Sequence, residues 1–456
     1  MNRLEIAFPI AALAVVALAL AIPFAVAAPV DDGEEESFDL DLDRAVEPPD
    51  VADERSATID DRQFESASAA IDAAEPGETV VLEGTFEERL VLATENVTVR
   101  AGPDGAAIDG GGEDSVVTVA AENVTVEGLW LHNSGDRVDE EDGAVFVDGD
   151  RATLTDLHVT DTAFGVWING ADGVTVADSR IEGREDVYPR VDRGNGIHLW
   201  ETEGTVIRNN EITNVRDGIY YSWTEDVVAE ENAMWNNRYG VHYMYSNDNR
   251  LEGNLAVDND VGYALMVSER LTVANNTAVR NTGSSGHGIL IKDVERSTVR
   301  GNVVVENGNG LYVYNAQDNR LAENLLLRNE VGIHATAGTD GQEVVGNSVI
   351  DNDDAVVTTT RSVAVWNGTD RGNYWSDARP IDLDGDGTSE VHHRPAGMVE
   401  HLVRENPQAA VFADSPAFDA VRLAESSFPV VESPGIVDRQ PLADSPHDWR
   451  EYANHR

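Results

Sequence analysis

Apolar and polar side chains alternate along the chain after each of a series of regularly spaced glycines. The first and third residues after the glycine are apolar or aromatic, as in Ile219 with Tyr221 and Val241 with Tyr243. A period of two is typical of a β-strand with one buried face. We therefore expect the first and third positions to fill a core, and the second and fourth positions to face outward.

The glycines recur with a period of 22 residues. They are Gly143, Gly165, Gly196, Gly218, Gly240, Gly262, Gly288, Gly310 and Gly332. Asparagines keep the same period from Asn210 to Asn347. A fixed period of this length indicates stacked structural units. Units built of short strands predict an all-β fold, a right-handed parallel β-helix in which equivalent residues stack in columns.

Two of the glycine steps exceed the period, by nine and by four residues. The excess lies near Glu182 to Asp192 and near Thr282 to Gly286. These residues should leave the coil as loops, and loops on one side of a solenoid commonly line a binding surface.

The periodic region is predicted to span residues 57–360, and the composition changes sharply on both sides of it. Residues 1–28 are predicted to be a targeting segment, because Arg3 precedes an apolar run that ends in the small residues Ala25, Val26 and Ala27. An uncleaved N-terminal anchor is the alternative, since the run is long enough to span a bilayer. In both cases we expect the rest of the chain to be exported. Residues 29–56 should form an acidic flexible spacer.

The C-terminal part is predicted to close the solenoid. Residues 361–395 are rich in Asp and Gly and should form a cap, which the last coil of a solenoid needs. Residues 396–456 should form a tail with short helices near Met398 to Arg404 and near Pro416 to Glu425.

The charge of the chain excludes one class of partner. Asp and Glu number 84 against 32 Lys and Arg, for a formal net charge of −52. Binding to nucleic acid needs clustered positive charge, so we expect no nucleic-acid partner. An acidic excess with a single lysine, Lys292, is typical of a halophilic protein. The absence of cysteine excludes disulfides and thiolate metal sites.

The outward second and fourth positions, called the outward stripe below, contain no Asp or Glu. Such an aromatic, charge-depleted surface is what protein binding requires; the alternative is that the cap or tail folds over it. The residues assigned to partner contact are Trp167, His198, Trp200, Tyr220, Lys292, Tyr312, Tyr314 and His334.

The outward stripe also carries soft metal ligands. Met244 and Met266 occupy equivalent positions in adjacent coils, about 4.8 Å apart by strand spacing, and His242 lies two residues before Met244. Thioether and imidazole ligands suit Cu(I) without cysteine. We predict a transient copper site at His242, Met244 and Met266, with simple packing of the methionines as the alternative.

An acidic loop in the cap is a candidate calcium site. Asp382, Asp384, Asp386 and Glu390 stand at loop positions 1, 3, 5 and 9, with Gly387 at position 6. Position 12 is His393, where a calcium loop has Glu. An acidic turn held by Asx hydrogen bonds is the alternative.

Enzymatic activity is the main alternative to a binding function. Parallel β-helices host polysaccharide lyases, epimerases and glycosidases, by fold-level analogy. A glycosidase needs two carboxylates across a groove, and a lyase needs a base beside a cation. Because the outward stripe offers no carboxylate, we predict a protein that is not an enzyme. Acids on the other two faces leave open an enzyme acting on acidic polysaccharide.

Several coil-specific strings resemble the NosD family, over roughly Glu78 to Leu442. They are RGNGIHLW (193–200), RDGIY (216–220), RYGVHYMYS (238–246), VGYALM (261–266), HGIL (287–290), GLYVYNA (310–316), GNYWSD (372–377), DLDGDG (382–387) and FPV (428–430). Ala378, His392 and His393 depart from the aromatic residues expected there.

The resemblance implies an exported accessory protein for assembly of the copper centres of nitrous oxide reductase. It also implies the partners: an ABC-type permease and ATPase, a copper chaperone and the reductase itself. The expected location is the periplasm or the external face of the cytoplasmic membrane, with membrane association through partners or an N-terminal anchor.

Overall fold

The computed structural model describes residues 48–453 apart from 337, 361, 398, 400–401, 404–405, 413–414 and 428–433. The predicted targeting segment, most of the acidic spacer and most of the predicted helix at Met398 to Arg404 lie outside the described residues. No helix in the described ranges has the length and apolar character needed to cross a membrane.

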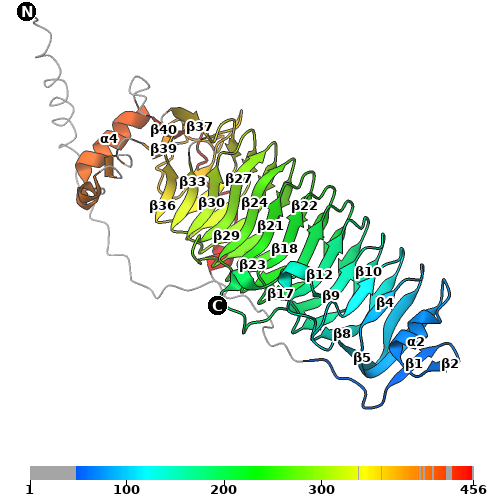
Figure 1. Cartoon of the computed structure of the whole chain (residues 1–456). Helices are drawn as coiled ribbons and strands as arrows, with labels where there is room; N and C mark the ends of the chain where they lie inside the picture. Colours follow the sequence, from blue (N-terminus) through cyan, green and yellow to red (C-terminus); the bar gives the residue numbers. More distant parts are fainter. Residues whose placement is uncertain are drawn as a thin grey trace, which may run out of the picture.

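Most of the chain winds into coils of three short strands, and equivalent strands of successive coils pair in parallel (Figure 1). This arrangement produces three long ladders. The ladder that carries the outward stripe is called the stripe ladder and contains β4 (Leu90–Leu92), β6 (Val117–Val119), β9 (Gly143–Val147), β12 (Phe164–Asn169), β15 (Ile197–Trp200), β18 (Asp217–Ser222), β21 (Tyr239–Met244), β24 (Val261–Glu269), β27 (His287–Glu295), β30 (Asn309–Tyr314), β33 (Val331–Ala335) and β36 (Asp354–Thr358).

The strand that follows in each coil belongs to a second ladder. It contains β3 (Thr79–Glu87), β5 (Thr98–Asp109), β7 (Thr125–Glu127), β10 (Thr153–Thr155), β13 (Thr175–Ala177), β16 (Val206–Arg208), β19 (Val228–Glu230), β22 (Arg250–Glu252), β25 (Thr272–Ala274), β28 (Thr298–Arg300), β31 (Arg320–Ala322) and β34 (Glu343–Val345).

The last strand of each coil belongs to a third ladder, which joins the second at the long strand β5. It contains β8 (Leu129–His132), β11 (His158–Thr160), β14 (Arg180–Glu182), β17 (Glu211–Thr213), β20 (Ala233–Trp235), β23 (Leu255–Val257), β26 (Thr277–Val279), β29 (Val303–Val305), β32 (Leu325–Leu327), β35 (Ser348–Ile350) and β38 (Tyr374–Trp375).

The predicted alternation is confirmed in the core. The first and third residues after the repeat glycines are buried, with 1% exposure or less at Ile219, Tyr221, Val241, Tyr243 and Val313. Tyr221 and Tyr243 stack with ring centroids 4.1 Å apart. Parallel ladders fill the interior of the solenoid in this way because each coil repeats the side-chain positions of its neighbour.

The glycine column is required by close packing between coils. A Cβ atom on Gly218 would lie 2.5 Å from the carbonyl oxygen of Gly240, and one on Gly240 would lie 2.6 Å from that of Gly262. Any larger residue would push adjacent coils apart. The glycine period in the sequence therefore reflects this close backbone contact between coils.

The asparagine column forms a continuous hydrogen-bonded ladder. Each side-chain amide donates to the next side-chain oxygen at 2.8–3.1 Å, from Asn210 through Asn347 to Asn373 in the cap. A second ladder, which the sequence analysis missed, runs from Asn259 through Asn281, Asn307 and Asn329 to Asn352. Buried amides need such partners, and only coils in equal register supply them.

Both ends of the solenoid are covered. At the N-terminal end, β1 (Ser56–Ile59) pairs antiparallel with β2 (Arg62–Phe64) and with β3, and α2 (Ala67–Asp72) lies beside them (Figure 1). At the C-terminal end β37 (Val363–Val365), β40 (Gly435–Asp438) and β39 (His393–Ala396) form a small sheet. η4 (Pro407–Phe412) and α4 (Pro416–Ser427) lie beyond it, and α4 packs against β39.

The end of the tail packs on the third ladder. Trp449 and Tyr452 contact the cluster that contains Leu327 and Ile350, and α5 (Arg450–Ala453) closes the described chain. His447 lies with Nδ1 2.7 Å from the Ser348 hydroxyl. The described part of the tail therefore covers a different face from the outward stripe.

We expect Asn254→Ala to lower the stability of the solenoid by roughly 2–4 kcal/mol. The change removes the bonds of Asn254 to Asn276 and Ala229, and it takes away the acceptor that the backbone N–H and side-chain amide of Asn232 share. Asn169→Ala, which removes one exposed hydrogen bond to Asp148, is the control and should change stability by about 0.5 kcal/mol or less. Urea denaturation compares the two; equal midpoints would contradict a stabilising ladder.

Candidate functional site

The outward stripe consists of two columns of side chains on the stripe ladder. In the first column, Trp167, His198, Tyr220, His242 and Ala264 pair in register from coil to coil. Leu290, Tyr312 and His334 continue this column. The second column contains Trp200, Ser222, Met244, Met266, Lys292 and Tyr314.

The first column is less accessible than the sequence analysis predicts. Trp167 is 6% exposed and His198 is 8% exposed. Trp167 packs with Phe164 and Val138, and Val138 comes from the loop that carries η2 (Val138–Glu140). The expectation that these side chains face solvent is therefore wrong at Trp167 and His198, as it is at His242, which is also 8% exposed. The role of Trp167 and His198 in partner contact stays a prediction. Trp200 and Tyr314 are exposed, whereas Tyr220, Lys292, Tyr312 and His334 are half-buried.

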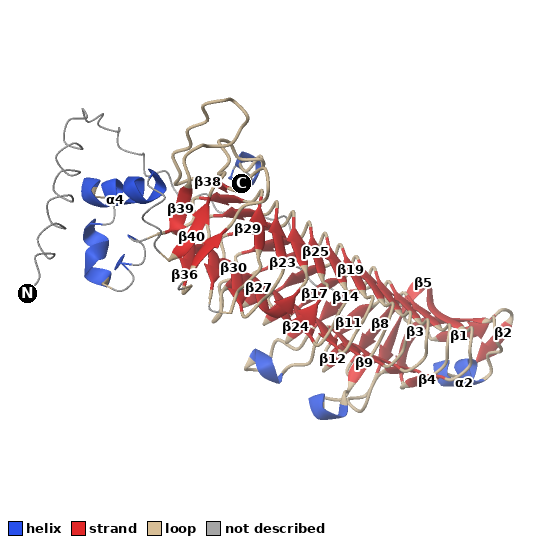
Figure 2. Ribbon diagram, turned by 90° about the horizontal axis from the view of Figure 1, so that it is seen from above, coloured by secondary structure: helices blue, strands red, loops and turns tan. Residues whose placement is uncertain are grey.

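The predicted loops border this face on one side (Figure 2). The insertion after β14 carries η3 (Arg190–Asp192), and its Arg190 reaches three coils along the axis to Asn236, the Asn237 carbonyl and Asp260. The shorter insertion lies between β26 and β27. The loops leave the coil where the third ladder passes into the stripe ladder, so they form one wall beside the first column.

Aromatic and imidazole rings contact one another along the first column in tilted and edge-to-face arrangements. Ring centroids are 3.7 Å apart for Trp167 and His198, 4.7 Å for His198 and Tyr220, and 4.9 Å for Tyr220 and His242. Asn195 hydrogen bonds Nδ1 of His198 at 3.2 Å. Burial lowers the pKa of His198 to about 3, so its ring stays neutral at ordinary pH.

His242 is held by a buried carboxylate. Its Nδ1 lies 3.0 Å from Oδ2 of Asp217, which is fully buried, and Arg238 donates to the same carboxylate at 2.8 and 2.5 Å. Burial opposes ionisation of Asp217, but the hydrogen bonds from His242 and Arg238 outweigh it and hold its pKa below the usual value. Nε2 of His242 is buried and has no hydrogen-bond partner among the described residues.

The sequence analysis missed Asp217. Alternation counted back through Gly218 places Asp217 with the core residues, whereas the structure turns its side chain to the outer face, where it contacts His242. Because Asp217 is enclosed and bonded to Arg238 and His242, it does not supply the exposed acid pair that a glycosidase needs.

The structure brings the predicted sulfur ligands into adjacent coils. Met244 and Met266 pair in register, and both are half-buried. Met266 also packs against the buried cluster of Val261, Ala264 and Leu290. His242 lies on the same face, two residues before Met244, with its free Nε2 in the first column. The three residues predicted as copper ligands thus share one patch of two neighbouring coils.

A second imidazole pair lies farther along the stripe ladder. The side chain of Asn309 contacts Nδ1 of His287 at 3.2 Å and Nδ1 of His334 at 3.1 Å, and Tyr312 stacks on His287. Burial lowers the pKa of His287 to about 4. His287 precedes its glycine as Asp217 does, so the same alternation count missed it.

The acidic loop of the cap brings three of its four predicted ligands together. Ligand oxygens of Asp382, Asp384 and Glu390 all lie within 4.8 Å of one another. The carboxylate of Asp386 instead accepts hydrogen bonds from the backbone and hydroxyl of Thr388. Asp384 accepts from the backbone of Asp386, and Asp386 from that of Thr388, two residues on in each case, which is the Asx-turn geometry of the alternative. Calcium binding here stays a prediction.

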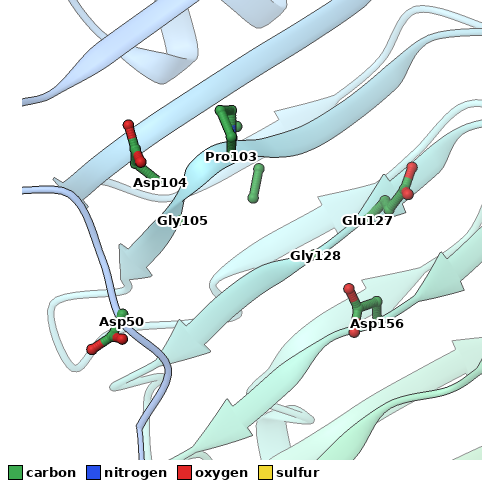
Figure 3. Close-up of a pocket in the computed structure, with 9 residues that line it drawn as sticks. Asp50, Pro103, Asp104, Gly105, Glu127, Gly128 and Asp156 are labelled. Atoms are coloured by element: carbon green, nitrogen blue, oxygen red, sulfur yellow. The ribbon is translucent and has the colours of Figure 1, made fainter.

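An open acidic depression lies over β5 and β7. It is lined by Asp50, Asp104, Glu127 and Asp156, whose carboxylates stand apart around it (Figure 3). In the described part of the chain, the loop of Asp382, Asp384 and Glu390 is the group of three carboxylates that converges on one point. The depression therefore lacks a converging cluster of that kind.

Comparison with solved structures supports the fold. A region described as right handed beta helix matches residues 51–278. The A-module of mannuronan C-5 epimerase AlgE6 from Azotobacter vinelandii aligns with a TM-score of 0.51 at 18% identity, over 64% of this chain and 90% of that one. A PL6 alginate lyase aligns with a TM-score of 0.50 at 17% identity, over 65% of this chain and 77% of that one. At such identities the likeness shows the fold alone. The protein is a right-handed parallel β-helix, as predicted.

Sequence comparison is more specific. The family described as periplasmic copper-binding protein (NosD) matches residues 177–380. The probable ABC transporter binding protein NosD of Pseudomonas aeruginosa is 42% identical over 358 residues, 75% of this chain and 83% of that protein. The protein of the same name from Stutzerimonas stutzeri is 38% identical over 359 residues, 75% of this chain and 81% of that one. The chain belongs to the NosD family.

The buried histidines should make the protein sensitive to acid. His198 has its pKa lowered to about 3 in the folded state, so only the unfolded state binds its proton between that pH and about 6.5. Stability should therefore fall as pH drops below 6.5, by up to about 1.4 kcal/mol per pH unit for this residue. His198→Gln should reduce the difference between urea midpoints at pH 7 and pH 5, while the titration of the carboxylates is common to both proteins. An unchanged difference would contradict this assignment.

Calcium should raise the melting temperature of the wild-type protein if the cap loop binds it, because a ligand that prefers the folded state stabilises it by mass action. Asp384→Ala should abolish the shift, and Asp386→Ala should largely retain it because Asp386 lies outside the converging group. Calorimetry with calcium and with chelator tests both variants. An equal response in the wild type and Asp384→Ala would place the ion elsewhere.

Proposed function

We propose that this protein is an exported accessory factor for assembly of the copper centres of nitrous oxide reductase. It works beside an ABC-type permease and ATPase and receives copper from a copper chaperone. The relatives are named ABC transporter binding proteins and the family is described as periplasmic and copper-binding, which supports an exported, copper-binding protein that works with an ABC transporter. The role in reductase assembly rests on the resemblance and on the site around His242.

The observation that carries the proposal is the free Nε2 of His242. A buried polar atom without a partner is costly, and here its ring is fixed through Nδ1 by Asp217. Metal-binding histidines are commonly held by a carboxylate on the other ring nitrogen, which sets the tautomer and raises the basicity of the ligand. Asp217 is therefore a positioning residue that keeps Nε2 available for Cu(I).

The sulfurs of Met244 and Met266 complete a soft ligand set. Copper is the cargo of this site, because two half-buried thioethers and one imidazole bind Cu(I) without hard carboxylate ligands on the exposed surface. Both methionines remain reachable from solvent at the outward stripe, so a partner can contribute a ligand or take the ion. We expect an affinity that allows transfer in both directions.

Arg238 supports the charge balance of the site. It pairs with the enclosed carboxylate of Asp217, which lets that carboxylate stay ionised beside His242. Bound Cu(I) adds positive charge next to this carboxylate, so burial of the ion is partly offset by Asp217. The structural likeness to alginate-active enzymes gives no residue a catalytic role, and no second function is proposed.

Replacing Met244 and Met266 by Leu together should weaken Cu(I) binding at least tenfold while leaving the fold intact, because Leu preserves volume and apolarity but lacks sulfur. The matched control is Met234→Leu, which removes a fully buried sulfur on the third ladder and should leave Cu(I) binding unchanged. Competition with a chromophoric Cu(I) chelator measures the affinities.

The same variants test the function in cells. A deletion strain should make reductase that lacks its catalytic copper centre, and the wild-type gene should restore it. At limiting copper the Met244→Leu, Met266→Leu double variant should restore much less activity than Met234→Leu. Normal reductase in the deletion strain would overturn the proposed function. Full restoration by the double variant would leave the function standing and refute the sulfur ligands.

A further inference from the structure

The corner that follows the stripe ladder is built from residues with left-handed backbone. Glu201, Trp223, Tyr245, Val267, Asp293 and Asn315 each directly follow the second-column residue of their coil, and their φ values are 49°, 57°, 55°, 49°, 54° and 46°. Asn and Asp tolerate this region, whereas a bulky residue there is an outlier. Trp223 and Tyr245 therefore occupy positions to which their side chains are poorly suited.

The solenoid gains little core packing from these two rings. Trp223 is 55% exposed and Tyr245 is 44% exposed, and they stack on each other with centroids 4.7 Å apart and planes 10° apart. The turn imposes left-handed backbone on every coil of this column, so the presence of exposed aromatic residues, where Asn or Asp would be less strained, points to a role other than packing. Trp and Tyr are also the residues most enriched at the energetic centres of protein interfaces.

The aromatic pair borders the proposed copper patch. Tyr245 directly follows Met244, and Trp223 directly follows Ser222, the residue in register with Met244. Trp200, 39% exposed, is in register with Ser222 on the other side. Trp200, Trp223 and Tyr245, called the aromatic corner below, thus lie at the opposite edge of the stripe ladder from the loops that carry η2 and η3.

Unpaired acids surround the aromatic corner. Glu201, Glu203 and Asp226 are exposed, and their carboxylates have no ion-pair partner among the described residues. Farther along the same edge the chain supplies its own cations: Arg270 pairs with Asp248 at 2.6 Å, and Arg296 pairs with Glu295 at 2.7 Å. The acids beside the aromatic corner have no such arginine among the described residues, so they are available to a cation from a partner.

We propose that the aromatic corner is a docking site for an arginine-bearing segment of a partner protein. A planar guanidinium can stack on Trp223 or Tyr245 and at the same time donate to the carboxylates of Glu201 and Asp226. Docking there would hold the partner against Met244 and Met266, where copper passes between the proteins. This inference rests on the proposed function, because the partner belongs to the copper-assembly machinery.

The decisive variant is Trp223→Asn with Tyr245→Asn, because Asn accepts left-handed backbone. Its melting temperature should equal or exceed that of the wild type. Its affinity for one of three purified probes, namely the permease–ATPase complex, the copper chaperone or the apo-reductase, should fall at least tenfold by biolayer interferometry. Asp293→Asn, two coils beyond Tyr245 in the same column, is the matched control and should bind like the wild type.

A second variant tests the charge. Glu201→Gln with Asp226→Asn keeps the shape of the corner, and it should weaken the same interaction and reduce its dependence on salt. Loss of binding in both variants without loss of stability supports the inference. Unchanged binding of all three probes would overturn it.

The outcomes separate this inference from the proposed function. If the aromatic-corner variant restores reductase maturation and binds every probe normally, the docking site is refuted while the proposed function stands. If the wild-type protein binds none of the three probes, both the docking site and the proposed partners are wrong.

Discussion

Equal register between successive coils is the constraint on which the rest of the structure depends. Buried asparagine amides are satisfied only when the next coil presents its own asparagine at the same height, and the glycine column leaves no room for a displaced backbone. Two such ladders fix the register on two edges of the coil. A side chain that points outward at one position therefore has a known neighbour in the coil above and the coil below.

Because of this register, residues at equivalent positions of successive repeats lie side by side on the surface. It sets Met244 beside Met266 and places Tyr220 between the imidazoles of His198 and His242. The regular columns also allow single departures to stand out: Asp217 turns outward to hold His242, and Trp223 and Tyr245 place exposed aromatic rings at left-handed positions beside the methionines. The proposed copper site and the proposed docking site are both local exceptions on an otherwise repetitive scaffold.

The β-helix could be predicted from the sequence alone, because the period, the alternation and the glycine and asparagine columns all result from the same packing of each coil on the next. It also placed His242, Met244 and Met266 on one face. Burial on that face could not be read from alternation, since Trp167 and His198 are covered by loops and by each other rather than by the core. Asp217, His287 and Trp223 were missed because they stand at the ends of strands, where the backbone turns and the count of two fails.

The central claim is that Asp217 holds His242 so that its Nε2 receives Cu(I). Nitrogen-15 NMR of histidine-labelled protein tests this claim most directly, with His242 assigned by comparison with His242→Gln. The account predicts that Nδ1 of His242 carries the proton in the copper-free protein, and that the Nε2 resonance shifts when one equivalent of Cu(I) is added. A proton on Nε2 in the copper-free protein, or an Nε2 resonance that does not respond to Cu(I), would contradict it.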